Sequence, residues 1–273
     1  MLTAYWLVAI DVPPEDVDLT SSALFDLGSV GIEEREAQRA VTLVASFPDE
    51  ASARSAQVAL GARSRVEKLE GDAWRDAWKE HFRPFRLCQG LWVRPPWEEH
   101  EPKRGEKVLV LEPGRAFGTG LHETTRLVAE AIRMQQRSLP RMDVLDVGTG
   151  SGILALVAIA FGARKAIGID VDPDAIEVAN ENAARNGMSD RVTFSTTPLA
   201  RLRGEFQLVV SNIEADVLIE LEKPLRQHLA HGGRMILSGI LDSREADVRR
   251  KLGKPIERAQ LGEWVVLTYT GTK

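Results

Sequence analysis

Residues 144–152 read VLDVGTGSG, and this stretch decides the fold of the 273-residue chain. The run 143–147 is typical of a buried parallel strand, and residues 153–161 are apolar enough to form the helix that covers it. The glycines between them permit a tight turn and a close ligand, because no Cβ intervenes. The next apolar run ends in Asp170, whose carboxylate can accept hydrogen bonds from ribose hydroxyls. The pattern predicts a nucleoside-binding βαβ unit.

The spacing of the glycines narrows the choice of nucleoside. Dinucleotide-binding loops follow G-x-G-x-x-G, whereas this loop follows G-x-G-x-G and has Ile153 where the last glycine would fall. No Lys or Arg lies nearby in the loop to bind a diphosphate. The loop resembles motif I of the class I S-adenosylmethionine (AdoMet) methyltransferases. That resemblance implies that the turn faces the methionine part of AdoMet and that Asp170 holds the ribose. A glycine turn without a ligand is the alternative, which Asp170 disfavours.

The composition indicates a soluble globular protein with one large or two modest domains, because 44% of the residues are hydrophobic. Cys88 is the one cysteine, which excludes an internal disulfide and fits a reducing compartment. Residues 1–11 lack the basic n-region of a signal peptide. No apolar run approaches the roughly 18 residues that span a bilayer. We expect a cytoplasmic protein.

The charge is unevenly distributed along the chain. The formal net charge is -5, and residues 1–70 hold six Lys or Arg against twelve Asp or Glu. An acidic module disfavours direct binding to nucleic acid phosphates and favours a basic partner. An ordinary solvated surface explains the same charge equally well.

Residues 1–70 are expected to form a small domain of their own. Their apolar pattern predicts the order β-α-β-β-α-β, which is the ferredoxin-like order, and contains no nucleophile, ligand cluster or phosphate loop. The predicted strands are 5–12, 29–35, 40–47 and 65–69, and the predicted helices are 15–27 and 50–60. Recognition or packing is the expected role, for which the fold is weak evidence.

Residues 71–83 predict a linker helix with Trp74, Trp78 and Phe82 on one face. The tryptophans could bind a substrate, but aromatic stripes usually bury, which favours a packed connection between domains. The second domain is then expected over residues 84–273. It would begin with an extended, proline-punctuated lead-in up to residue 112.

The rest of the second domain alternates between strands and helices. A helix is predicted over 126–137 and strands over 143–147, 166–170, 191–195, 206–211, 233–238, 255–260 and 264–269, with helices between the first five. Asp172 and Pro173 predict a helix N-terminus, which Asn186 and Gly187 close. The short turn at residues 261–262 makes the last two strands antiparallel. We therefore expect a mostly parallel seven-stranded sheet with one reversed edge strand.

A second glycine-rich turn, EPGRAFGTGLHETT, covers residues 112–125. Such a segment can present backbone N–H groups and hydroxyls to a bound carboxylate. Capping of the next helix by Thr124 or Thr125 is the alternative, and both interpretations can hold at once. His122 could act as a base, but a single His in a glycine turn is more often structural.

Asn212 ends the predicted strand 206–211 with the sequence Ser-Asn-Ile-Glu. Ligands of doubly wound sheets lie outside the carboxyl ends of the strands, so Asn212 is expected to face the same crevice as Gly148. Its amide oxygen could orient an incoming amine. A buried Asn that caps the helix starting near Asp216 is the alternative.

Together these segments resemble the bacterial ribosomal protein L11 methyltransferases over essentially the whole chain. The residues that carry the resemblance are the Trp74/Trp78 helix, the run 112–125, the loop 144–152, Gly168-Ile169-Asp170 and Ser211-Asn212-Ile213. The segment 118–125 is specific to that group and its close relatives, whereas the loop 144–152 is shared by many methyltransferases.

The resemblance implies AdoMet-dependent methylation of lysine side chains and an N-terminal α-amine of a basic ribosomal protein, without a metal. The protein would be a monomer whose N-terminal domain recognises the substrate and swings on the linker helix. The chemistry of the transfer, rather than the resemblance, makes Asn212 the predicted catalytic residue, because Asn212 or a nearby backbone carbonyl could accept a hydrogen bond from the amine and direct its lone pair. The implied cofactor contacts are Thr125, Gly148, Asp170 and Asn212, with Thr119, Asp146 and Gly150 as further candidates.

The chain departs from common methyltransferase patterns in two places. The strand that ends at Asn212 is not followed by an Asn/Asp-Pro-Pro-Tyr amine clamp, and residues 196–198 offer no acid for the adenine amine.

Two alternative functions stay open. One is an AdoMet methyltransferase for a small molecule or another protein, such as an electron-transfer flavoprotein subunit. The other is a module that binds AdoMet without catalysis, which would need broken motifs, and these motifs are intact.

Overall fold

The computed structural model describes residues 5–13, 16–29, 31–37, 40–47, 49–61, 64–69, 83–112 and 120–271. The chain divides into two compact units, Met1–His81 and Phe82–Lys273, called here the N-terminal and C-terminal units. The predicted linker helix falls almost entirely outside the described residues, so the predicted domain boundary stays a prediction.

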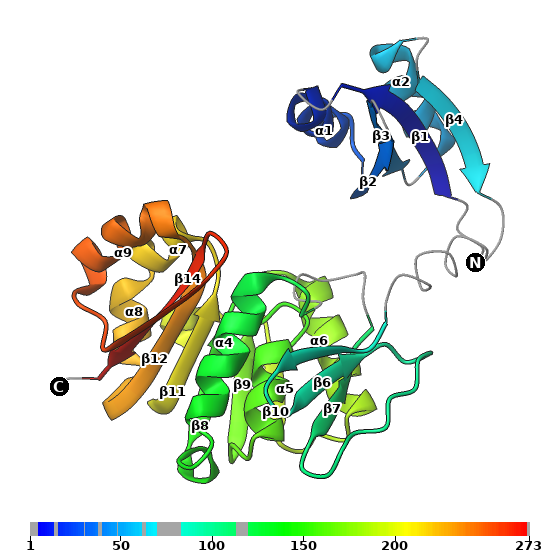
Figure 1. The fold of residues 1–273 in the computed structure, drawn as a ribbon. Helices are drawn as coiled ribbons and strands as arrows, with labels where there is room; N and C mark the ends of the chain where they lie inside the picture. Colours follow the sequence, from blue (N-terminus) through cyan, green and yellow to red (C-terminus); the bar gives the residue numbers. More distant parts are fainter. Residues whose placement is uncertain are drawn as a thin grey trace. The chain divides into compact units, whose positions relative to one another are not determined.

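The N-terminal unit has the predicted β-α-β-β-α-β order. Its elements are β1 (Tyr5–Val12), α1 (Val17–Asp26), β2 (Gly31–Ala37), β3 (Ala40–Phe47), α2 (Glu50–Leu60) and β4 (Ser64–Leu69). The strand order is β2-β3-β1-β4, and every neighbouring pair is antiparallel (Figure 1). This arrangement confirms the ferredoxin-like fold.

Alternate residues of the central strands build the core of the N-terminal unit. Val8 and Ile10 of β1 and Leu43 and Phe47 of β3 are buried in one cluster with Leu24 of α1. Because successive strand residues point to opposite faces, this period of two buries one face of the sheet beneath the helices.

The C-terminal unit begins with a small sheet where the sequence predicted an extended lead-in. Strands β5 (Phe85–Cys88), β6 (Leu91–Arg94) and β7 (Lys107–Val110) pair in that order, with β5–β6 antiparallel and β6–β7 parallel. The prolines fall outside the strands, in the connections that precede β5 and join β6 to β7. Because prolines flank these short strands, the sequence of residues 84–112 predicted an extended stretch and not a sheet.

A seven-stranded sheet forms the centre of the C-terminal unit, in the order β10-β9-β8-β11-β12-β14-β13. Its strands are β8 (Asp143–Val147), β9 (Lys165–Ile169), β10 (Val192–Ser195), β11 (Phe206–Asn212), β12 (Leu229–Leu241), β13 (Glu257–Leu261) and β14 (Trp264–Thr270). The chain moves outward from β8 to β10 on one side and from β11 to β13 on the other. The order of the strands therefore reverses between β8 and β11.

The predicted reversed strand exists, but its predicted place at the edge is wrong. Strand β14 is antiparallel to both neighbours and lies between β12 and β13. Its residues Val265 to Tyr269 are buried, whereas all five residues of β13 are exposed. The more apolar strand takes the interior position because burial of its side chains stabilises the sheet, and the polar strand takes the edge.

Helices cover both faces of this sheet. Buried residues of α4 (Glu123–Met134), α5 (Ile153–Ala160) and α6 (Pro173–Arg185) share one core cluster, and those of α7 (Ala215–Glu220), α8 (Glu222–Gln227) and α9 (Glu245–Leu252) share the other (Figure 1). Helix α5 is buried almost all round, as its uniformly apolar sequence requires.

One predicted helix is wrong. Between β10 and β11 the chain forms only a 3-10 turn, Leu199–Arg201. Pro198 precedes this turn and the extended Leu202 follows it, which leaves too few residues for an α-helix. The cap predicted for α6 is confirmed, because the Asp172 side chain accepts from the N–H of Asp174, with Pro173 at the start of the helix.

Candidate active site

The glycine turn lies at the carboxyl end of β8, beside the point where the strand order reverses. Parallel pairing sets Val147 opposite Ile169 of β9 and Ser211 of β11. The residues that follow these three, which are Gly148, Asp170 and Asn212, therefore share one edge of the sheet. Ligands of open α/β sheets bind in this position.

The turn itself needs glycine. Gly148, Gly150 and Gly152 have φ of +72°, +51° and +80°. The N–H groups of Gly148 and Thr149 both donate to Ile169 O, at 2.9 and 3.0 Å, which ties the turn to the end of β9. A Cβ on Gly148 would lie 2.3 Å from Ile213 Cγ2. Residue 148 therefore has neither the backbone conformation nor the space for a side chain.

We expect Gly148→Ala to destabilise the protein by about 2–5 kcal/mol, the sum of a left-handed backbone and an overpacked contact. Gly105→Ala is the matched control, because Gly105 has φ +89° but no atom within 4 Å of its would-be Cβ. It should lose only the roughly 1–2 kcal/mol of the backbone term. Urea unfolding of both variants measures the difference. Equal losses would show that the contact with Ile213 is unimportant.

Asp170 follows β9 directly and holds the turn. Its Oδ2 accepts from the N–H of Gly150 at 2.8 Å, and its Oδ1 accepts from the N–H of Asp172 at 3.1 Å. The side chain is half-buried. Each carboxylate oxygen has two lone pairs, so both oxygens keep capacity for a further donor.

Asp146 is completely buried beneath the same turn. Its Oδ2 accepts from Thr149 Oγ1 at 2.7 Å and from the N–H of Ala155 at 3.2 Å, whereas its Oδ1 has no hydrogen-bond partner. Burial raises the pKa of Asp146 to about 7 against the two hydrogen bonds, which lower it, and the Asp170 charge raises it further. Buried acceptors without a donor are uncommon in proteins, which makes Oδ1 of Asp146 a candidate contact for a ligand.

Asn212 and Thr125 meet across 87 residues of sequence. The Asn212 amide lies 3.4 Å from the buried Thr125 hydroxyl, to which its Nδ2 donates, and leaves Oδ1 available as an acceptor. The neighbouring Ser211 hydroxyl donates to Val147 O at 2.8 Å, which fixes β11 against β8. Asn212 does not cap the next helix, because α7 begins at Ala215 after Glu214 and has no side-chain cap. The alternative interpretation of Asn212 as a cap is therefore wrong.

His122, rather than Thr124 or Thr125, is the N-cap of α4. Its Nδ1 accepts from the N–H of Thr124 at 3.3 Å and lies 2.8 Å from the Thr124 hydroxyl. Both threonines lie inside the first turn of the helix, which starts three residues earlier than predicted. The His122 ring also packs against Trp264 of β14, with ring centroids 5.0 Å apart. A ring engaged in this way supports the structural interpretation of His122.

Trp264 was missed by the sequence interpretation, which assigned it only to a strand. Its contact with His122 joins the β13–β14 hairpin to the start of α4. No local pattern marks this contact, because the two residues are far apart in sequence. Some residues that the sequence singled out lie outside the described residues. They are residues 113–119, which include Thr119, and the linker aromatics Trp74, Trp78 and Phe82.

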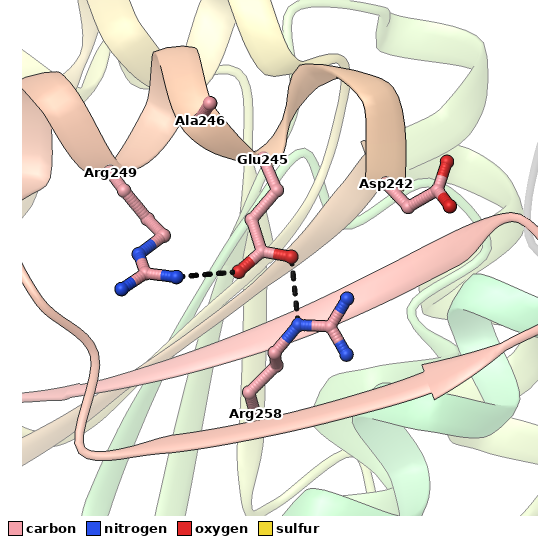
Figure 2. Close-up of a pocket in the computed structure, with 5 residues that line it drawn as sticks. All are labelled: Asp242, Glu245, Ala246, Arg249 and Arg258. Atoms are coloured by element: carbon pink, nitrogen blue, oxygen red, sulfur yellow. Dashed lines mark hydrogen bonds and ion pairs between the residues drawn. The ribbon is translucent and has the colours of Figure 1, made fainter.

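A separate hollow of about 530 Å³ lies between α9 and β13 (Figure 2). Its lining residues are Asp242, Glu245, Ala246, Arg249 and Arg258. Glu245 accepts from Arg249 Nη1 at 3.2 Å and from Arg258 Nε at 2.7 Å. Glu245 thus pairs with both lining arginines, and no predicted cofactor contact lines this hollow. It is therefore not the candidate site.

The residues that the structure describes contain neither a membrane-spanning helix nor a cluster of metal ligands. Within these ranges no helix is long and apolar enough to cross a membrane. No group of three or more His, Cys, Asp or Glu side chains in the same part of the chain could hold a metal ion.

Comparison with known proteins gives one consistent result. The family model described as ribosomal protein L11 methyltransferase matches residues 33–272. A relative of that name from Sorangium cellulosum is 50% identical over 270 residues, covering 93% of this chain and 85% of its own. Another from Pelobacter propionicus is 34% identical over 304 residues, covering 98% of both chains.

The structural comparison agrees with the sequences. The crystal structure of ribosomal protein L11 methylase from Lactobacillus delbrueckii subsp. bulgaricus has a TM-score of 0.63 and 32% identity, and covers 68% of this chain and 97% of its own. The predicted fold, a class I methyltransferase domain after a small α+β domain, is confirmed, and so is the predicted resemblance. With the glycine turn, Asp170 and Asn212 at one sheet edge, this chain belongs to the ribosomal protein L11 methyltransferase family.

Proposed function

We propose that this chain transfers methyl groups from AdoMet to amines of ribosomal protein L11. The observation that carries the proposal is the meeting of three groups at one sheet edge: the glycine turn, the Asp146–Asp170 carboxylates and the Asn212–Thr125 pair. Relatives named for the same activity, at up to 50% identity, support it. A protein that methylates a ribosomal protein would work in the cytoplasm, and we propose that it acts as a monomer.

The residues present fit AdoMet. Asp146 offers an unpaired acceptor oxygen for the ammonium of the cofactor, and Asp170 keeps lone pairs for the ribose hydroxyls. Gly148 and Gly150 permit the backbone to approach the methionine part closely. Thr125 and Asn212 would complete the contacts, and Thr119 would join them from outside the described residues. When bound, AdoMet supplies an activated methyl group on its sulfonium.

The protein's part in the reaction is to deliver a neutral, oriented amine. Asn212 donates through Nδ2 to Thr125, so its Oδ1 can accept from the amine and direct the nitrogen lone pair. The amine must first lose its proton, although a free lysine titrates near 10.4. A partly desolvated amine beside a positive group loses it more readily, so no dedicated base is required.

Two further points are which amines of L11 are methylated and which unit of this chain recognises L11. We infer that lysine side chains and the N-terminal α-amine are the acceptors, and that the N-terminal unit binds the substrate protein. The acidic excess of residues 1–70 supports this role, because it favours a basic partner.

Labelled AdoMet provides the direct test. The protein is incubated with purified ribosomal proteins, an electron-transfer flavoprotein and a small-molecule extract, and mass spectrometry locates the label. Label on L11 lysines and its N-terminus supports the proposal. Label only on the flavoprotein or on small molecules would replace the substrate, and AdoMet binding without any transfer would indicate a binding module.

Asp170→Ala is expected to weaken S-adenosylhomocysteine (AdoHcy) binding by about 1.5–3 kcal/mol, or roughly 10- to 150-fold, because the ribose hydroxyls lose a charged acceptor. Isothermal titration calorimetry measures the affinity. Asp172→Ala is the matched control: this nearby acid caps α6 through Asp174 and is exposed. It should lower stability by about 1 kcal/mol but leave the affinity unchanged. Equal loss of affinity in both variants would contradict the ribose role.

A further inference from the structure

Asp146 has hydrogen-bond donors on only one of its two carboxyl oxygens. Both of its hydrogen bonds, from Thr149 Oγ1 and from the N–H of Ala155, reach the same oxygen, Oδ2. The second oxygen, Oδ1, is buried without a partner, and the side chain is 0% exposed. A carboxylate in such a position has lost its water and gained donors on only one side. Its ionised form is therefore costly.

The ionisable neighbour of Asp146 in the described part of the chain is another acid. Asp170, which follows β9, acts on Asp146 by like-charge repulsion. Helix α5 packs above with no ionisable side chain, and the adjoining residues of β11, Ser211 and Asn212, are uncharged. The described residues thus supply no cation to balance the buried charge. Burial and this repulsion raise the pKa of Asp146 to about 7.

We propose that Asp146 is the proton-linked counter-ion of the cofactor's amino group, so that binding of AdoMet or AdoHcy expels a proton from the protein. This inference rests on the proposed function, because it needs a cofactor with an ammonium at this place. The O–H bond of the neutral carboxyl breaks and its proton passes to the buffer. The resulting carboxylate accepts a hydrogen bond from the ammonium through Oδ1, and the buried oxygen gains its missing partner.

The sign of the pH dependence follows. An ammonium near Asp146 lowers its pKa in the complex, so the affinity rises with pH until Asp146 is ionised in the free protein as well. The window closes near pH 8, where an α-amino group itself begins to lose its proton. With Asp146 titrating near 7, AdoHcy should bind about eightfold more weakly at pH 6 than at pH 7.5.

Calorimetry of AdoHcy binding counts the proton directly and needs no variant. Titrations at pH 6.5 in phosphate and in imidazole, which have different ionisation enthalpies, should reveal release of about 0.8 proton per ligand bound if Asp146 titrates near 7. Release near zero between pH 5.5 and 7.5 with intact binding would overturn the inference alone. No AdoHcy binding at any pH would overturn the proposed function instead.

Three variants assign the proton to Asp146. Asp146→Asn keeps an acceptor for Thr149 and Ala155 but cannot ionise, so binding should weaken and proton release should vanish. Thr149→Val removes a hydrogen bond that lowers the pKa, so the midpoint of the affinity profile should move to higher pH. Asp143→Asn, on the same strand but paired with Arg164, should behave as the unaltered protein.

A merely structural role for Asp146 predicts a different result. It would change the affinity in Asp146→Asn without changing the proton count of any folded variant, and that outcome overturns the inference. If Asp146→Asn does not fold, the unaltered protein and Thr149→Val decide: an unmoved midpoint in Thr149→Val, with an unchanged proton count, would assign the proton elsewhere.

Discussion

Deletion of residues 1–70 is expected to abolish methylation of ribosomal protein L11 while leaving AdoHcy binding intact. Every described residue assigned to the cofactor lies in the C-terminal unit, whose two core clusters contain no residue of the deleted segment. The deleted segment has a core of its own around Val8, Leu43 and Phe47. Loss of that unit should therefore remove substrate recognition and spare the cofactor site. Transfer of labelled methyl groups and calorimetry with AdoHcy measure the two functions separately.

The matching experiment uses the deleted piece. Residues 1–70 alone should bind L11, and the interaction should weaken as salt is raised, because the acidic excess of this segment acts over about a Debye length of 10 Å at 0.1 M. Full activity of the truncated enzyme on L11 would disprove the recognition role. If the truncated enzyme binds no AdoHcy, the isolated segment becomes the test, and absence of L11 binding would then refute the role.

Local patterns were sufficient for most of the fold. The apolar runs around the glycine turn predicted β8, α5 and β9 within about a residue, because a fully buried strand and a fully buried helix both need uninterrupted apolar sequence. The apolar pattern of residues 1–70 likewise predicted the four strands of the ferredoxin-like sheet. Elements whose formation depends on burial can therefore be predicted from the apolar pattern of the sequence.

The errors concern the position of β14 in the sheet and a few short segments, which are the 3-10 turn Leu199–Arg201 and the strands β5, β6 and β7. The hairpin of β13 and β14 was predicted, but which of its strands would pair with β12 depends on the burial of Val265–Tyr269 against the exposed β13. The order of the strands depends on how the whole sheet packs. A turn of two residues shows that two strands are neighbours but not which of them pairs with β12. The three short strands β5, β6 and β7 were predicted only as an extended lead-in and not as a sheet, because each has only four residues, too few for a period to be visible.

The candidate site was likewise predictable from the sequence only in part. Gly148 and Gly150 follow β8 and Asp170 follows β9, so their shared position was predictable from the parallel order of the strands alone. The unpaired oxygen of Asp146 was not, because a carboxylate in an apolar run does not reveal how many donors it will meet. Nor was the choice of His122 as the cap of α4, since Thr124 and Thr125 are better caps by residue type.

Asn212→Ala is expected to lower the turnover number about 100-fold, the typical cost of losing a group that orients a reactant, while the affinity for AdoHcy changes much less. The amide is held by Thr125 at the end of β11, so its remaining oxygen can direct the amine only if that hydrogen bond sets its orientation. Steady-state kinetics on L11 at saturating AdoMet, with calorimetry for the cofactor, separates the two effects.

Ser211→Ala is the matched control for Asn212→Ala. It lies one residue earlier on the same strand and removes a buried hydrogen bond to Val147 O, so it should lower stability by about 1 kcal/mol without a comparable loss of turnover. A similar fall in both variants would mean that the position of β11 matters and the amide does not. An equal loss of turnover and cofactor affinity in Asn212→Ala would make Asn212 a cofactor ligand only. Unchanged turnover would remove it from the chemistry altogether, and the lone pair of the amine would then have to be directed by a backbone carbonyl at the same edge.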